Sequence, residues 1–340
     1  MPVLNIAAVA TDDLARLIAK PSDQRDVHTY VHKESGDGGA RILSIIRPAK
    51  YPERLRPLLN ALSAARVGLI EVEAVDATLG EALVAFASAG IERGLAVIRP
   101  KDGGWIDEDQ VKGLFQQAGL GAWTFEAEDG PHLRERFYAL MDDLSEELAE
   151  ASTQPLVIPV DQHFNVRGIG LVAIGYVQAG TVNQHDELLL LPAEGGGTAK
   201  SLQVMDDDVP TATAGDRVGL ALRNAQEAHL SGGTLIVHPP LDDPRTGTHR
   251  PPAMHLHARS TVHLTPSPFQ RRTLQTGDVI HLSVDLQFIV GRVTAAEGNV
   301  LTVEWDHPAL IRAHAPPQAV IAQLDSKPRI IGSGRLEQQA

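Results

Sequence analysis

The first 150 residues alternate between short apolar runs and segments with helical periodicity. The apolar runs predict five strands, at residues 3–10, 41–46, 67–72, 94–98 and 123–125. The segments between them predict five helices, at residues 12–20, 52–64, 77–88, 108–118 and 132–149. Residues 28–40 hold three glycines and are expected to form an irregular loop. Strands that alternate with helices of this length are typical of a mostly parallel sheet.

The pattern changes after residue 150, because no helical period continues beyond residue 156. Short β-branched or leucine-rich runs recur between turn residues up to residue 237, and a second set follows from residue 255 to 324. Such spacing is typical of closed all-β barrels. The proline-rich stretch 238–254 predicts a linker between them. We therefore expect an α/β domain at residues 1–150 and two β-barrels, at residues 155–240 and 251–335.

Composition excludes several classes of protein. Hydrophobic residues make up 43% and charged residues 21% of the chain, which is too apolar for general disorder. No apolar stretch approaches the ~20 residues that span a bilayer. The chain has no cysteine, which excludes disulfides, thiolate metal sites and cysteine nucleophiles. Its first residues lack the basic segment of a signal peptide, so a cytoplasmic location is expected.

The net charge of −13 limits the kinds of binding partner that we expect. An acidic chain has no general attraction to phosphate backbones, so we expect no binding to DNA. A local basic patch would still allow contact with RNA. No membrane partner is expected either.

The segment IPVDQHFNVRGIGLVAIGYVQAGTVNQHDELLLLP, residues 158–192, carries a specific pattern. A phenylalanine precedes a G-x-G turn, a strand follows, and G-x-V-x-x-G ends the run. This pattern resembles the second domain of the elongation factor Tu family, above all its selenocysteine-specific branch and the related initiation factor gamma subunit. The segments AGDRVGLAL and GGTLI continue the resemblance, and HLTPSPFQRRTLQTGDVIHLSVDLQFIVGRV and PRIIGSGRL are similar to the third domain.

The resemblance implies a multi-domain α/β plus all-β fold, in which a P-loop-GTPase-like domain precedes two barrels. The family's nucleotide motifs are nevertheless missing. No lysine follows a glycine, so the phosphate-binding G-x-x-x-x-G-K-[ST] loop is absent. Asp12 and Asp13 stand where phosphate would bind, and like-charge repulsion disfavours it there.

The other two nucleotide motifs are also degenerate. By position, the metal-binding Asp-x-x-Gly falls on Arg47 to Lys50, and the guanine-reading Asn-Lys-x-Asp keeps only Asp102. We interpret the first domain as a pseudo-GTPase with no catalytic residues, no cofactor and no metal. Asp102, Arg47 and Lys50 are its candidate vestigial nucleotide-binding residues. The favoured alternative is that Arg47 and Lys50 fill the old pocket by pairing with Asp12 or Asp13.

In the second domain, the resemblance implies a pocket for the 3′ end of tRNA. Carried over position by position, the candidates are Asp161, Phe164, Gly168, Gly170 and Arg217. The family's second acid and its threonine fall on Gln162 and Ile174, so half of the pocket departs from the pattern. Phe164 as barrel core and Asp161 as a turn residue is the alternative.

The third domain contains a candidate group of zinc ligands. His255, His257 and His263 share one strand face by parity, but no further ligand can be placed, so packed or solvated histidines are favoured.

Three hypotheses for function remain. The leading one is an elongation-factor-like translation protein without nucleotide dependence, which binds tRNA, the ribosome or a translation-factor protein. Without a switch, its domains are expected to keep a fixed arrangement. The first alternative is an adaptor that binds a protein partner and no tRNA. The second is a GTPase whose nucleotide site was rebuilt from Arg47, Lys50 and Asp102.

Overall fold

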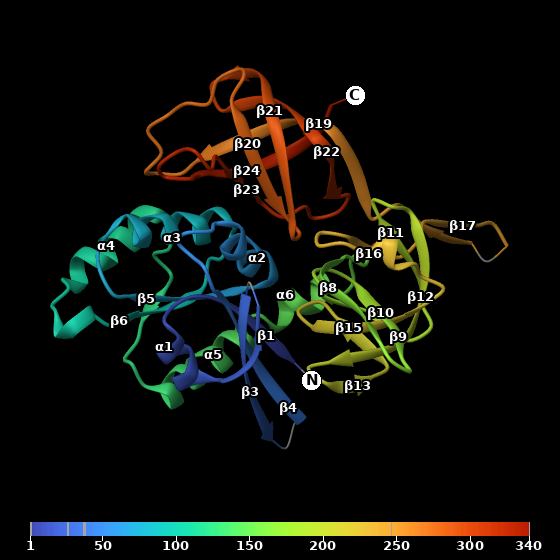
Figure 1. Ribbon diagram of the computed structural model, residues 1–340, viewed down its shortest axis with the longest axis horizontal. Helices are drawn as coiled ribbons and strands as arrows, with labels where there is room; N and C mark the ends of the chain where they lie inside the picture. The colour runs from blue at the N-terminus through green and yellow to red at the C-terminus, as the bar shows by residue number, and fades with distance from the viewer. Residues whose placement is uncertain (1, 26, 37–38, 246, 340) are drawn as a thin grey trace.

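The computed structural model describes residues 2–25, 27–36, 39–245 and 247–339. Figure 1 shows an α/β domain in blue and green, a yellow-green barrel beside it and an orange-red barrel above both. This is the predicted architecture, and the two-barrel prediction is confirmed. Within the described residues no helix is long and apolar enough to cross a membrane.

The first domain is built on a seven-stranded sheet of order β2-β3-β4-β1-β5-β6-β7. Its parallel part consists of β4 (Gly39–Pro48), β1 (Val3–Val9), β5 (Val67–Val72), β6 (Gly94–Ile98) and β7 (Thr124–Phe125). At one edge, β2 (Lys20–Gln24) and β3 (Val27–Gly36) pair antiparallel. The central strands are buried on both faces, which explains their continuous apolar runs.

Helices cover both faces of this sheet. The buried residues of α2 (Arg56–Ala64), α3 (Ala77–Ser88) and α4 (Glu108–Ala118) pack on one face. Those of α1 (Asp12–Ile18) and α5 (Gly130–Asp143) pack on the other, and α6 (Ser145–Ala151) follows toward the second domain. Local signals fix the ends, since Asp107 caps α4 and Gly119, at φ 90°, ends it.

Two predictions for this domain are wrong. Residues 28–40 are no irregular loop, because β3 and β4 pair as a long antiparallel hairpin through this region. β-branched and aromatic residues such as Thr29, Tyr30 and Val31 favour the extended strand, and the described glycines lie only at its tip. The predicted helix 132–149 is two helices, α5 and α6, which meet at Leu144. Residues 37 and 38 lie outside the described residues.

The second domain is a closed barrel. Its strand order is β11-β16-β8-β9-β15-β12, and β12 pairs with β11 to close the ring. These strands are β8 (Ile158–Val166), β9 (Gly170–Tyr176), β11 (Glu187–Leu191), β12 (Gly195–Val204), β15 (Arg217–Arg223) and β16 (Leu235–Val237). Short additions are β10 (Thr181–Asn183), β13 (Asp207–Val209), β14 (Thr211–Thr213) and the 3₁₀ turn η2 (Glu227–His229).

The third domain is also a closed barrel, of order β19-β22-β21-β20-β23-β24. These strands are β19 (Met254–Pro266), β20 (Val279–Val284), β21 (Gln287–Glu297), β22 (Val300–Arg312), β23 (Ala319–Ala322) and β24 (Ile330–Gln338). The predicted linker 238–254 is not wholly irregular, since β17 (Leu241–Asp243) pairs with β18 (Thr248–Arg250) within it.

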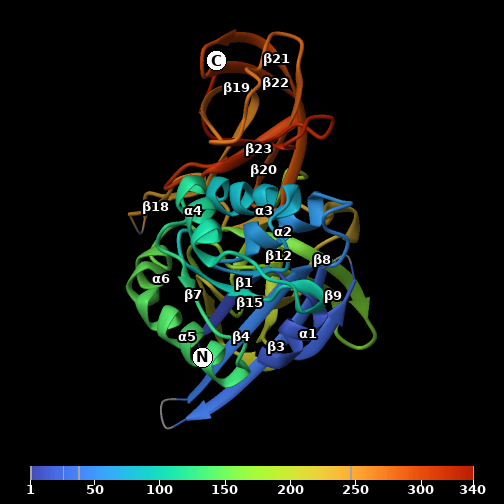
Figure 2. The same ribbon diagram turned by 90° about the vertical axis from the view of Figure 1, so that its left-hand side faces the viewer.

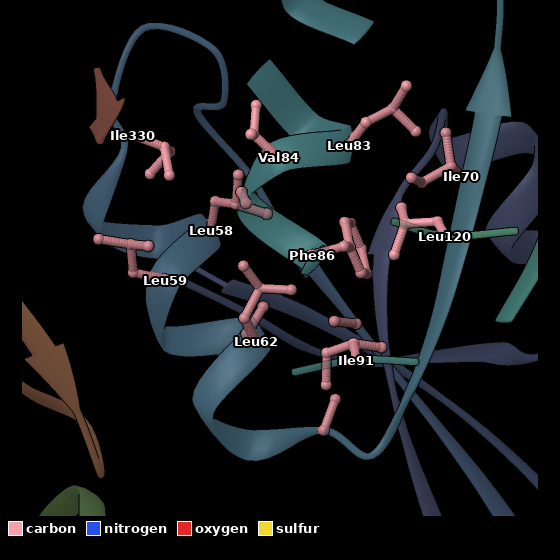
Figure 3. Packing of buried hydrophobic residues seen from close by; sticks show 14 of the residues in the cluster. Leu58, Leu59, Leu62, Ile70, Leu83, Val84, Phe86, Ile91, Leu120 and Ile330 are labelled. Atoms are coloured by element: carbon pink, nitrogen blue, oxygen red, sulfur yellow. The ribbon is translucent and has the colours of Figure 1, made fainter. Parts of the chain in front are cut away.

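One of the hydrophobic clusters contains residues of all three domains. The cluster formed by α2, α3 and α4 also contains Tyr176 from the second domain and residues such as Ile330 from the third. Figure 3 shows Ile330 among the side chains of Leu58, Leu59 and Val84, and Figure 2 shows the third barrel resting on α2, α3 and α4. Burial of apolar surface therefore holds the domains together as one unit.

An ion pair reinforces this contact. The Arg329 guanidinium, in the third domain, donates to both carboxylate oxygens of Glu81 on α3, with Nε to Oε2 at 2.8 Å. Its Nη2 also donates to the Pro52 carbonyl at 2.8 Å. The side chains are only 19% and 10% exposed, so water screens this attraction weakly.

We predict that Glu81→Gln lowers the free energy of unfolding by roughly 2 kcal/mol, because Arg329 loses its charged acceptor. Denaturant unfolding measures the loss, and small-angle scattering should detect a second, more open form of the variant. Glu135→Gln, on an exposed carboxylate of α5, is the control. Equal stability of the two variants would contradict a role for the pair in domain docking.

Candidate functional site

The link between β1 and α1 decides what the first domain can bind. It consists of two residues, Ala10 and Thr11, and Thr11 already caps the helix by accepting the Leu14 N–H at 3.3 Å. A phosphate-binding loop needs a longer glycine-rich segment, whose N–H groups wrap around the anion. The acidic first turn, Asp12 and Asp13, follows at once.

A buried carboxylate lies beside this link. Glu71 on β5 is 1% exposed in its side chain, and its Oε2 accepts the Thr11 N–H at 2.6 Å. Its Oε1 lies 3.1 Å from Nη1 of Arg99, the residue that follows β6. Arg99 also contacts Glu128 through Nε at 3.0 Å, and the hydrogen bond to Glu71 raises the pKa of the guanidinium. The chain thus places its own anion at the carboxyl end of the sheet, where α/β sheets bind ligands.

The expected pairing of Arg47 and Lys50 with Asp12 or Asp13 is wrong. Asp12 instead accepts hydrogen bonds from Tyr30 and from Arg16, one helical turn later, and both lower the pKa of its carboxyl. Arg47 donates from Nε to the Ala10 carbonyl at 2.5 Å. Asp12 binds Arg16 and Tyr30 instead of Arg47, because Arg16 shares a helix face with Asp12 and Tyr30 lies on the neighbouring hairpin. Burial and the bond to Asp12 raise the pKa of Tyr30 to about 12.

A cavity of about 380 Å³ remains at this edge of the sheet. Its charged lining residues are Arg47, Lys101, Glu71, Glu73 and Asp76. Glu73 pairs with Lys101 at 3.3 Å, and Asp76 caps α3 by accepting the Leu79 N–H at 2.9 Å. A triphosphate here would meet three carboxylates. Within the described ranges, no group of three acidic or histidine side chains could hold a metal ion.

The structure separates the three candidate nucleotide residues. Arg47 lines this cavity, and Lys50 lines a different and larger one. Asp102 is exposed in the 3₁₀ turn η1 (Lys101–Gly103), at a φ of 54°. Sequence reasoning missed Glu71, although a lone acid inside the buried run VGLIEV required a partner.

The larger cavity, about 1140 Å³, lies where the three domains meet. The first domain contributes the cations Arg25, Lys50, Arg54 and Arg56, together with Asp23 and Glu53. Asp161, Gln162 and Tyr176 come from the second domain, and Phe288, Leu324 and Arg329 from the third. We call it the central cavity.

Asp161 lines the central cavity, and Arg217 lies near enough for its charge to act on the Asp161 carboxyl. A β-bulge interrupts the pairing of β8 with β9 at Asp161, and both Asp161 and Gln162 line the cavity. The Gln162 amide donates to Asp161 and to Asp23, each at 3.1 Å. Arg217 lies 6.0 Å from the centre of the Tyr176 ring. Burial raises the pKa of Asp161, and the charge of Arg217 opposes the rise.

Two buried polar atoms of this cluster lack a hydrogen-bond partner within the described structure, Oε1 of Gln162 and Nε of Arg217. Such atoms are costly unless water or a ligand satisfies them.

The other candidate tRNA-binding residues of the second domain, Phe164, Gly168 and Gly170, do not line the central cavity. Phe164 is half-buried on β8, and Gly168 and Gly170 form the exposed turn to β9. Their φ values of 85° and 106° are left-handed, which explains the requirement for glycine. The β8–β9 hairpin therefore lines the central cavity with Asp161 and Gln162 and ends in this turn.

The expected common face of the three histidines is wrong. A register shift follows His257 in β19, so parity does not continue along the strand. His257 is buried against Ser260, at 3.2 Å, while His255 is exposed and His263 pairs with Glu337 at 3.3 Å.

We predict that Arg99→Met lowers the free energy of unfolding by about 3 kcal/mol, because the buried Glu71 carboxylate loses its cationic partner and keeps only the Thr11 N–H. The double variant Glu71→Gln/Arg99→Met should recover most of the loss in denaturant unfolding. Lys101→Met, which breaks the exposed pair with Glu73, is the control and should cost little. A similar small cost for Arg99→Met would contradict a buried charge at Glu71.

No protein-family model matches the chain. An uncharacterized protein of Methanocaldococcus jannaschii is 24% identical over 96% of both chains. Elongation factor 1-alpha of Methanosarcina mazei is 32% identical over 29% of this chain and 24% of its own length.

Solved structures of translation elongation factors share the fold over nearly the whole chain. The bacterial selenocysteine-specific elongation factor EF-Sec superposes with a TM-score of 0.76 at 18% identity, over 99% of this chain and 58% of its own. SelB from Methanococcus maripaludis in its apo form gives 0.74 at 16%, over 99% and 79%. The chain thus spans about three fifths of EF-Sec and a quarter of elongation factor 1-alpha. Its fold is that of the translation elongation factors, and over 29% of its length its sequence is similar to elongation factor 1-alpha.

Proposed function

We propose that this protein is an elongation-factor-like translation protein that has lost GTP binding and hydrolysis and that holds the acceptor end of a tRNA in its central cavity. The single observation that carries the proposal is the contrast between the two cavities. The cavity at the carboxyl end of the sheet is lined by three carboxylates and two cations, whereas the central cavity is lined by five cations and three carboxylates.

Loss of nucleotide binding follows from the contacts of Glu71. The Thr11 N–H, at the position where a phosphate would be bound, already donates to this carboxylate. Asp12 and Asp13 add two more negative charges in the first turn of α1. A nucleotide would have to displace the buried Glu71 carboxylate from the Thr11 N–H and overcome this repulsion.

RNA binding is supported by charge in the central cavity. Lys50, Arg54 and Arg56 have no salt bridge with any described residue, although the chain as a whole carries a net charge of −13. Arg56 lies 5.6 Å from the centre of the Phe288 ring. Cations bind phosphates, and the partly exposed ring of Phe288 offers an aromatic surface for a base.

The polar wall suits the chemistry of a terminal nucleotide. Asp161 and the unpartnered Oε1 of Gln162 are hydrogen-bond acceptors, which fit ribose hydroxyls or the ammonium of an aminoacyl group. The hairpin turn with Gly168 and Gly170 extends from the same strand and leaves its backbone open to a partner.

We predict that Lys50→Gln and Arg54→Gln each weaken tRNA binding about fivefold and lower the slope of log affinity against log salt by about 1. Fluorescence anisotropy with labelled aminoacyl-tRNA and deacylated tRNA measures both quantities. Lys112→Gln, on α4 and outside the central cavity, is the control and should bind as the unaltered protein does.

The same experiment separates the alternatives. No binding of tRNA or ribosomes, together with capture of a single protein partner, would replace the proposal by the adaptor function. Equal weakening by all three variants would show that binding follows overall charge and not the central cavity.

A further inference from the structure

A third cavity, of about 220 Å³, lies at a different junction of the three domains. Arg66 and α6 contribute from the first domain, Gln178 from the second, and Arg312 and His314 from the third. Figure 1 shows α6 between the first domain and the second barrel. The volume exceeds the roughly 30 Å³ that one water takes in the liquid several-fold, so a small ligand fits.

Two arginines line this cavity, Arg66 and Arg312, and the one buried carboxylate beside them, Asp285, lies behind the wall on Arg312. Arg312 pairs with Asp285 through two hydrogen bonds, of which Nε to Oδ2 measures 2.9 Å. The two side chains are 9% and 2% exposed, so the pair is buried. Arg66 donates from Nη2 to the Gln178 carbonyl at 2.8 Å and forms no salt bridge with any described residue.

Arg66 is therefore short of a counter-ion. Burial lowers the pKa of its guanidinium and the neighbouring charge of Arg312 lowers it further, while the charges of Asp285 and Glu147 oppose the fall without cancelling it. Most of its N–H donors remain free of the described acceptors, while the guanidinium fork matches the oxygens of phosphate or sulfate.

The acids on this cavity lie at its solvent side. Glu147 is 58% exposed in its side chain and pairs with Arg93 at 2.5 Å, and Glu150 is exposed. Water screens both carboxylates, so they compensate Arg66 weakly. His314 is also exposed and adds a donor at the rim.

We propose that this cavity binds a small tetrahedral oxyanion, of the phosphate or sulfate class, between Arg66 and Arg312, with His314 at the entrance. The anion supplies the missing negative charge and joins the first domain to the third. Its binding stabilises the docked arrangement of the domains, because only that arrangement brings the two arginines together.

Thermal unfolding in inorganic phosphate tests the proposal. With sodium chloride at matched ionic strength as the reference, saturating phosphate should raise the Tm by about 3 °C or more. Calorimetry should give saturable binding of one phosphate per chain. Arg66→Met should lose both effects, and the matched control Arg93→Met, which alters the pair at the rim, should keep them.

The source of the anion is tested in parallel. Binding of inorganic phosphate and methyl phosphate, but not of a short 5′-phosphorylated RNA, would indicate a free ion, and binding of the RNA would indicate a phosphate of a nucleic acid. If Arg66→Met does not fold, His314→Ala provides the test and should weaken phosphate binding several-fold. The proposal is overturned if phosphate acts no differently from chloride, or if the folded variant tested binds phosphate as the unaltered protein does.

Discussion

The burial of one carboxylate at the carboxyl end of the sheet governs the first domain. Glu71 lies on a strand that is buried along its whole length, so its charge requires donors close by. Thr11 and Arg99 supply them, and they come from the two segments that follow β1 and β6. The contacts of Glu71 with Thr11 and Arg99 join the segments that a nucleotide-binding domain keeps free for its ligand. They satisfy the buried carboxylate in the absence of a bound nucleotide.

The contacts between the domains also agree with a first domain that does not act as a nucleotide switch. A protein that changes shape with a bound nucleotide needs an interface that can open. Here the core of the first domain continues into both barrels, and Arg329 anchors the third barrel to α3 and to the Pro52 carbonyl. Under the proposed function, the protein presents a fixed surface with preformed cavities, and preformed sites bind without the cost of reordering the protein.

The sequence predicted the domain order because the change from helical to strand periodicity near residue 150 is a local property of the chain. It failed for the β3–β4 hairpin, because the glycines near its tip suggest a loop while the β-branched residues that precede them, Thr29 and Val31, favour a strand. It placed Asp161 and Arg217 in one region, but the pairing of Arg47 with Asp12 was wrong, because Arg16 and Tyr30 compete for the same carboxylate. The partners of Glu71 are far apart in sequence, and only the folded sheet brings them together.

Calorimetric titration with GTP and GDP in the presence of magnesium tests the central claim most directly. At protein concentrations that detect a Kd of about 10 μM, the account predicts no heat of binding for either nucleotide. Saturable binding of one nucleotide per chain, lost on Arg47→Ala in the cavity of the first domain, would contradict it. Such a result would mean that a phosphate displaces Glu71 from its contacts with Thr11 and Arg99, and that the first domain still binds a nucleotide.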